Sequence, residues 1–109
     1  MTTIKTEAIV VMCTAPAGFD SEPLARDLVQ RSLAACVQVL PGVVSIYQWK
    51  GSVEKSQENL LLIKTRRGRF AEIEAAIRAL HPYDVPEIVA LPVSDGHVPY
   101  LAWIAGNTA

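Results

Sequence analysis

Residues 35–49 of this chain read ACVQVLPGVVSIYQW, a long run of strand-forming side chains interrupted only by Pro41-Gly42. β-Branched and aromatic residues favour extended backbone, and Pro-Gly within such a run is typical of a kink or bulge. As one bent strand the run would span roughly 50 Å at ~3.3 Å per residue. Lys50-Gly51-Ser52 then predicts a hairpin turn that sends the chain back through residues 54–63.

The segments on either side of this hairpin predict two further strands and three helices. Residues 8–13 are a continuous apolar run, expected of a central strand buried on both faces. A first helix should begin at Asp20 or Ser21, with its apolar face running from Leu24 through Leu28 to Ser32.

A second helix is predicted from about Arg69 to His81, where Pro82 stops it. Its apolar stripe is expected to consist of Phe70, Ile73, Ile77 and Leu80. Residues 87–93 read as a last core strand, and a short C-terminal helix follows Pro99.

The order β-α-β-β-α-β with a C-terminal helix predicts an α+β fold, a ferredoxin-like sandwich with a long central hairpin. The 109 residues are expected to form a single domain, residues 1–109.

The second helix would span only about 20 Å, much less than the hairpin. The far end of the hairpin therefore protrudes into solvent or meets another subunit, and we expect a cyclic oligomer because closed rings terminate strand-edge pairing.

Composition excludes several classes of partner. The net charge is −1, which gives no basic surface for nucleic acid or an anionic membrane. No apolar run approaches the ~20 residues of a membrane span. Glu7 interrupts the apolar start, so we expect a cytoplasmic protein and no signal peptide.

Cys13 and Cys36 form no CxxC or zinc pattern and are expected to be free thiols.

Residues 81–87, HPYDVPE, carry the densest collection of functional groups. Two prolines four residues apart make this a stiff loop. An imidazole, the phenol of Tyr83 and the carboxylates of Asp84 and Glu87 lie on it. The loop is therefore a candidate binding platform.

Glu58, Lys64 and Glu87 lie close to apolar strand segments, where charges must be paired or solvated. They can form a salt-bridge network at an interface or line a ligand pocket. Large aromatic side chains allow the same two roles, pocket lining or interface packing; these are Tyr47, Trp49, Tyr83 and Trp103.

Cys36 and His81 are the candidate metal ligands, because a thiolate and an imidazole suit copper or zinc. Cys36 can equally be a small core residue, and His81 can interact as a cation with the carbonyls at a helix C-terminus. No spacing motif joins the two residues.

Several enzyme motifs are absent from the sequence. Residues 15–18 lack the glycines and the lysine of a phosphate-binding loop, and no GxSxG is present. The loop after the first strand has no arginine that could hold a phosphate, as an acylphosphatase would need. We expect neither catalysis nor an organic cofactor.

Several separated segments resemble the divalent-cation tolerance protein CutA family in the same order. They are Leu33–Val37, Tyr47–Gly51, Glu58 with Leu60-Leu61, Ile63–Thr65, His81–Ile88 and Tyr100–Trp103. The resemblance implies a ferredoxin-like homotrimer, similar in assembly to the PII signalling proteins, with a link to divalent cations and to copper in particular. Asp84 stands where the family usually has Glu, so the reach of that carboxylate is one methylene shorter.

We therefore expect a trimeric, non-catalytic protein with a metal-linked role and a site at the subunit boundary. Two alternatives stay open. One is a PII-like sensor of a small anionic metabolite, with Lys64 as the counter-ion. The other is an oligomeric scaffold that holds a partner protein.

Overall fold

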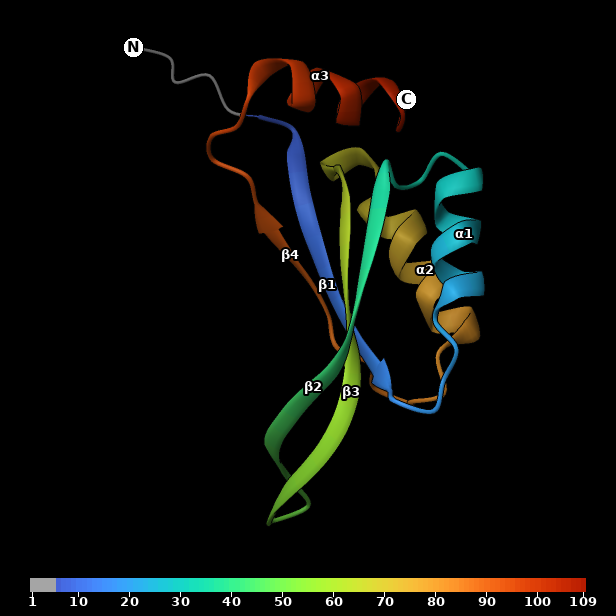
Figure 1. Cartoon of the computed structure of the whole chain (residues 1–109), viewed down its shortest axis with the longest axis vertical. Helices are drawn as coiled ribbons and strands as arrows, with labels where there is room; N and C mark the ends of the chain where they lie inside the picture. Colours follow the sequence, from blue (N-terminus) through green and yellow to red (C-terminus); the bar gives the residue numbers. More distant parts are fainter. Residues whose placement is uncertain (1–5) are drawn as a thin grey trace.

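The computed structural model describes residues 6–109. In chain order the elements are β1 (Ala8–Pro16), α1 (Glu22–Gln30), β2 (Cys36–Trp49), β3 (Ser52–Arg66), the 3-10 turn η1 (Arg67–Arg69), α2 (Phe70–Leu80), β4 (Ile88–Pro92) and α3 (Val98–Gly106). The strands form one antiparallel sheet in the order β2-β3-β1-β4 (Figure 1). This order confirms the predicted ferredoxin-like α+β fold.

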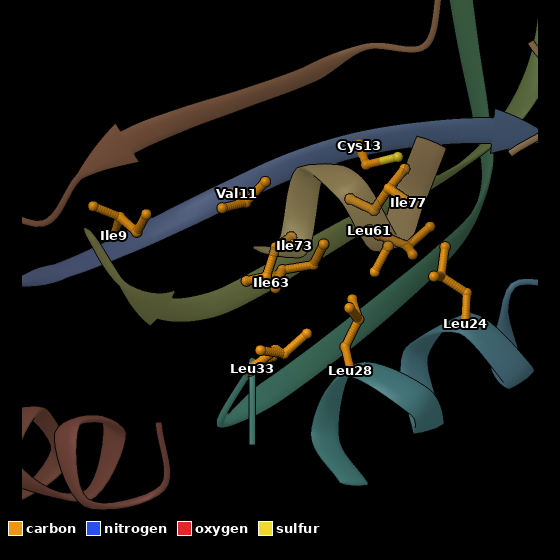
Figure 2. Packing of buried hydrophobic residues seen from close by; sticks show 12 residues of the cluster. Ile9, Val11, Cys13, Leu24, Leu28, Leu33, Leu61, Ile63, Ile73 and Ile77 are labelled. Atoms are coloured by element: carbon orange, nitrogen blue, oxygen red, sulfur yellow. The ribbon is translucent and has the colours of Figure 1, made fainter. Parts of the chain in front are cut away.

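The core lies between the sheet and two helices, α1 and α2, which cover the same face (Figure 1). Because strand side chains alternate between faces, every second residue of β1 and β3 points to these helices. Figure 2 shows the result, in which Leu24 and Leu28 of α1 and Ile73 and Ile77 of α2 meet Val11, Cys13, Leu61 and Ile63 of the sheet. All eight side chains are buried.

The expectation that β1 is buried on both faces is wrong. Val10 and Met12 are only half-buried, because α1 and α2 both lie on the Val11 side of the sheet. We call the opposite side the open face. Its apolar members, by strand register, are Val10, Met12, Leu60, Leu62, Val89 and Leu91. The apolar run of β1 therefore has a second face with no helix pair to cover it.

The long hairpin forms as the sequence predicts. The β2–β3 register shifts between Leu40 and Val43, where Gly42 has a φ of 78° that side-chain-bearing residues rarely adopt. Lys50 and Gly51 make the turn, with φ values of 50° and 83°. Positive φ at both central residues is the geometry that best matches the twist of a two-residue hairpin.

The far end of the hairpin extends beyond the helices (Figure 1), and the longest dimension of the described chain is 48 Å. Tyr47 pairs with Glu54, and its neighbour Ile46 pairs with Lys55, so the two side chains lie on opposite faces. Ile46 is 70 % exposed and Trp49 is 53 % exposed. The predicted overhang is therefore confirmed.

Helix α1 ends earlier than predicted. It stops at Gln30, and Ser32, expected on its apolar face, has a φ of 56°. Left-handed backbone just past a helix is a common way to end it. The N–H of Leu33 then donates to the carbonyl of Leu28 at 3.0 Å, and this reversal turns Leu33 into the core.

Helix α2 matches its predicted bounds within one residue at each end and stops before Pro82. Its apolar stripe differs in one member. Leu80 is 52 % exposed, whereas Ala76 is buried beside Ile73 and Ile77. Among residues 6–109 no helix is long and apolar enough to cross a bilayer.

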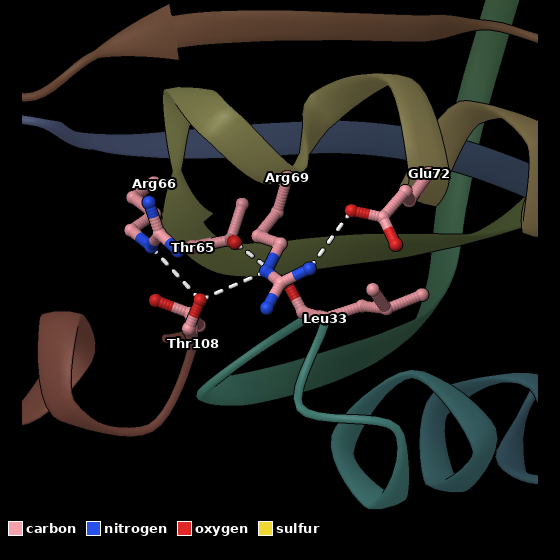
Figure 3. A network of polar contacts seen from close by, with 6 residues as sticks. All are labelled: Leu33, Thr65, Arg66, Arg69, Glu72 and Thr108. Atoms are coloured by element: carbon pink, nitrogen blue, oxygen red, sulfur yellow. Dashed lines mark hydrogen bonds and ion pairs between the residues drawn. The ribbon is translucent and has the colours of Figure 1, made fainter.

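Two arginines, one at the end of β3 and one in η1, bind the chain just after α3 (Figure 3). The Nε groups of Arg66 and Arg69 each donate to the carbonyl oxygen of Thr108 at 2.8 Å. Arg69 also donates to Glu72 at 2.8 Å, and the hydroxyl of Thr65 donates to the Leu33 carbonyl at 2.6 Å. The two bonds to Thr108 hold the end of α3 in place, and Ile104 of α3 packs against Ala8 and Ala35.

Burial raises the pKa of the Cys13 thiol to about 12, with smaller contributions from the negative charges of Glu87 and Glu58. At pH 8 only about one thiol in ten thousand would then be a thiolate, the form that reacts. We therefore predict that the single thiol of a Cys36→Ser variant resists a disulfide reagent in the folded protein and reacts fully in denaturant.

The raised pKa of Cys13 also predicts how the free energy of unfolding changes at alkaline pH. The folded protein holds the thiol proton more tightly than the unfolded chain does. The free energy of unfolding is therefore unaffected below the unfolded thiol's pKa, near 9.0, and falls as pH rises from there toward 12. Cys13→Ala should therefore flatten the fall in unfolding free energy over this interval. Rapid labelling of folded Cys36→Ser at pH 8 would contradict the buried, protonated state of Cys13.

Candidate functional site

Most of the predicted site residues fall into two groups on the open face, one near the middle of β3 and one near its C-terminal end. Cross-strand partners in an antiparallel pair share a face, so Lys64 lies with Cys36 and Val10, its register partners on β2 and β1. Glu58 has the same parity on β3 and lies on the same face as Lys64. We call the two groups the carboxylate end and the lysine end.

Glu58 forms the centre of the carboxylate end. It is 6 % exposed, and the hydroxyl of Tyr83 donates to its carboxylate at 3.2 Å. No lysine, arginine or histidine forms an ion pair with it among residues 6–109. A buried carboxylate normally needs a cation as well as hydrogen bonds, so Glu58 is under-compensated within one protomer.

Tyr83 is held against Glu58 by the stiff loop. Desolvation raises the pKa of its phenol, and the charge of Glu58 and the hydrogen bond to it act in the same direction. The proton therefore stays on Tyr83, which is the donor that Glu58 requires. Tyr47 lies close enough to contribute to this shift, and the Ser56 hydroxyl donates to its oxygen at 3.3 Å.

His81 positions this loop through both ring nitrogens. Its Nε2 donates to the carbonyl of Thr14 at 2.6 Å, and its Nδ1 accepts the backbone N–H of Tyr83 at 3.1 Å. This pattern fits a neutral ring with its proton on Nε2. The helix-end interpretation is therefore corrected: the imidazole bonds to β1 and not to the last carbonyls of α2.

The lysine end is built by β2, β3 and α3. The ammonium of Lys64 lies 5.7 Å from the ring centre of Tyr100, a cation–π distance. Tyr100 stacks on Trp103 with ring centres 5.6 Å apart. Lys64 forms no ion pair with a carboxylate among residues 6–109. This end therefore carries an uncompensated positive charge beside aromatic rings.

Cys36 and His81 do not meet within one protomer. Cys36 lies opposite Lys64, which pairs with Val10, whereas His81 contacts Thr14, four residues further along β1. Four residues of strand correspond to about 13 Å. No three His, Cys, Asp or Glu side chains in the described part of the chain are placed to hold one metal ion. The two candidate ligands therefore belong to different places on the protomer.

Three other predicted site residues stay exposed. The ammonium of Lys50 lies 5.9 Å from the ring centre of Trp49, near the hairpin tip. Asp84 and Glu87 form no ion pair within residues 6–109, although Glu87 is near enough to Cys13 to raise its pKa. Their role in the pocket remains a prediction.

Sequence reasoning missed two groups that build the site. Tyr100 lies three residues before Trp103 on a predicted helix, and this spacing could have shown that the two rings share a face. The Thr14 carbonyl that holds His81 left no signal, because every residue type has a backbone carbonyl.

Comparison with known proteins shows which of them share this arrangement of elements. The family described as CutA1 divalent ion tolerance protein matches residues 9–107. A divalent-cation tolerance protein CutA from Thermus thermophilus is 48% identical over 99 residues, which cover 91% of this chain and 96% of that protein. The chloroplastic protein CutA of Arabidopsis thaliana is 43% identical over 101 residues, which cover 93% of this chain but 56% of the plant protein.

A solved structure agrees with the sequence comparison. The divalent cation tolerance protein (Cut A1) from Thermus thermophilus superimposes with a TM-score of 0.89 at 46% identity, over 94% of this chain and 99% of that chain. The family match over residues 9–107 includes all of the sheet but its first residue, the three helices, and both Glu58 and Lys64. The chain belongs to the CutA1 family of divalent ion tolerance proteins.

Proposed function

We propose that this divalent-cation tolerance protein works as a homotrimer whose sites form where the carboxylate end of one protomer meets the lysine end of the next. One observation carries the proposal. Glu58 and Lys64 are opposite charges on one face of one strand, and each lacks an ionic partner within residues 6–109. Six residues of strand hold them roughly 20 Å apart, so they cannot neutralise each other within a protomer.

A second copy of the chain is the partner that best fits both ends. The open face between them is apolar, with Val89 47 % and Leu91 50 % exposed. Its two ends differ in charge, so two copies fit head to tail, and a head-to-tail contact that closes gives a ring. The number three comes from the resemblance to the family, and the unpaired outer edges of β2 and β4 add backbone groups for the same contact.

We propose that metal sensing, with copper as the ion, involves Cys36 at this boundary. Within one protomer the residues do not fit a copper site, because Cys36 stands apart from His81 and both ring nitrogens of His81 are already bonded. The open-face position of Cys36 beside Lys64 makes it a residue to which a second copy could add ligands. Soft thiolate ligands suit copper.

We also propose that the protein is not an enzyme and functions in the cytoplasm. The thiol of Cys13 is kept protonated by burial, which suits packing and not nucleophilic attack. Cys13 faces the helices and Cys36 faces the other side of the sheet, so both stay free thiols, as a reducing compartment favours.

Assembly is tested by light scattering of the wild type and of Trp49→Ala. We predict a trimer at micromolar concentration, and a weaker one in the variant, because loss of a large interface aromatic costs about 2 kcal/mol or more. Val29→Ala is the matched control, since Val29 is similarly exposed but lies on α1. A stable wild-type monomer would remove the basis of the proposal.

Copper binding is tested by calorimetric titration of wild type, Cys36→Ser and His81→Ala. Cys36→Ser should weaken binding at least about tenfold, and wild-type affinity should fall as pH drops because binding displaces the thiol proton. His81→Ala should mainly lower thermal stability, since it removes the two bonds that hold the loop. Unchanged copper affinity in Cys36→Ser would show that Cys36 is a packing residue and does not bind copper.

A further inference from the structure

A groove away from the open face lies where the β1–α1 loop passes the bulge of β2. Its walls are residues 17–21 of the loop, Glu22 at the start of α1, Val39 and Pro41 of β2, and Asn59 of β3. Its volume is about 490 Å³, within the usual range for small-molecule sites. Neither end of the subunit boundary contributes to it.

Ser21, in the wall of this groove, carries an unsatisfied polar group. The residue is 3 % exposed, and its Oγ is the one buried side-chain oxygen or nitrogen among residues 6–109 without a hydrogen-bond partner. Ser21 is the N-cap of α1, yet its hydroxyl makes no cap bond. Buried hydroxyls are nearly always paired, so the Ser21 hydroxyl needs a partner from outside the chain, and a water or a ligand in the groove can supply it.

The charges around the groove determine whether it favours an anion or a cation. The start of α1 carries a partial positive charge, about half a unit, that favours anions. Two carboxylates oppose it. Glu22 is neutralised by Arg26 at 3.0 Å, whereas Asp20 forms no ion pair within residues 6–109 and contributes a full negative charge. The Oδ1 of Asp20 accepts the backbone N–H of Glu22 at 3.1 Å, and its other oxygen is left for a ligand. The full charge outweighs the partial one, so the groove favours a cation.

Asn59 adds a second acceptor to the groove. Asn59 donates its Nδ2 to the carbonyl of Phe19 at 3.4 Å, which leaves its Oδ1 free to accept. Val39, Pro41 and the Phe19 ring supply apolar surface beside these acceptors. A donor-rich cation with a short apolar stem complements this set.

We propose that the groove binds a primary ammonium on a short alkyl stem, independently of the metal-linked role. The ammonium lies between the Asp20 carboxylate, the Asn59 Oδ1 and the Ser21 Oγ, and rotation about one side-chain bond turns the hydroxyl to it. The stem packs on Val39 and Pro41. The same chemistry is presented by a free alkylamine and by a lysine side chain.

The test is titration of the folded, isotope-labelled protein with n-butylamine, followed by amide NMR shifts, with butyrate as the anionic counterpart. We expect saturable shifts in residues 18–22 and in the Asn59 side chain with the amine and none with butyrate. A parallel titration with Nα-acetyl-lysine amide separates the two sources, because tighter binding than butylamine identifies a lysine side chain and weaker binding a free amine.

Variants make the outcome decisive. Ser21→Ala should weaken amine binding roughly fivefold, the loss of one hydrogen bond, while the unliganded protein melts at the same or a higher temperature. Asp20→Asn should abolish binding, and Gln30→Ala, at the other end of α1, should leave it unchanged. Equal binding of butyrate, no saturable shift with amine, or a lower melting temperature of Ser21→Ala would each overturn the proposal.

Discussion

The pairing of β3 with both of its neighbours is the constraint on which the rest of the structure depends. β3 runs from Ser52 to Arg66 and pairs with β2 along its length and with β1 over its second half. Since the side-chain period of a strand is two, this single register assigns each residue of β3 to a face. Leu61, Ile63 and Thr65 go to the helices, and Glu58, Leu60, Leu62 and Lys64 go to the open face. A slip of one residue would bury Lys64 and expose Ile63.

Because β2 and β3 are longer than the helices, part of the sheet has no cover within the protomer. The hairpin extends past α1 and α2, so its far half has no cover from these helices (Figure 1). Tyr47 of this half lies near Tyr83, which donates a hydrogen bond to Glu58. The same open face ends at Lys64, beneath the aromatic pair of α3. The protomer thus leaves two unlike charges at the two ends of an apolar surface, an arrangement that a head-to-tail neighbour would satisfy.

The fold was largely predictable because its signals are local. Apolar periodicity located the helices, Pro82 marked the end of α2, and Pro41-Gly42 and Lys50-Gly51 marked the bulge and the turn. Two errors came from non-local causes. Ser32 fits a helical face, but the chain must reverse there to bury Leu33. The apolar run of β1 predicted burial on both faces, yet one of those faces is left uncovered by α1 and α2.

The site was predictable as a set of residue types but not as a geometry. The sequence put His81, Tyr83 and Glu58 among the candidates, and the structure joins them through Thr14 and a hydrogen bond between Tyr83 and Glu58. It also separates Cys36 from His81, which depends on strand register and not on spacing along the chain. The unpaired hydroxyl of Ser21 could not be foreseen, because serine before a helix normally predicts a satisfied cap.

The most direct measurement of the central claim is a double-mutant cycle on assembly and stability with Glu58→Gln and Lys64→Met. If the two charges meet across a subunit boundary, each single change strands a buried charge and costs about 3–5 kcal/mol. The double variant should then lose clearly less than the sum of the two. Additive losses below about 1 kcal/mol, as expected of solvated charges, would show that Glu58 and Lys64 are not partners and that the boundary site proposed from them does not exist.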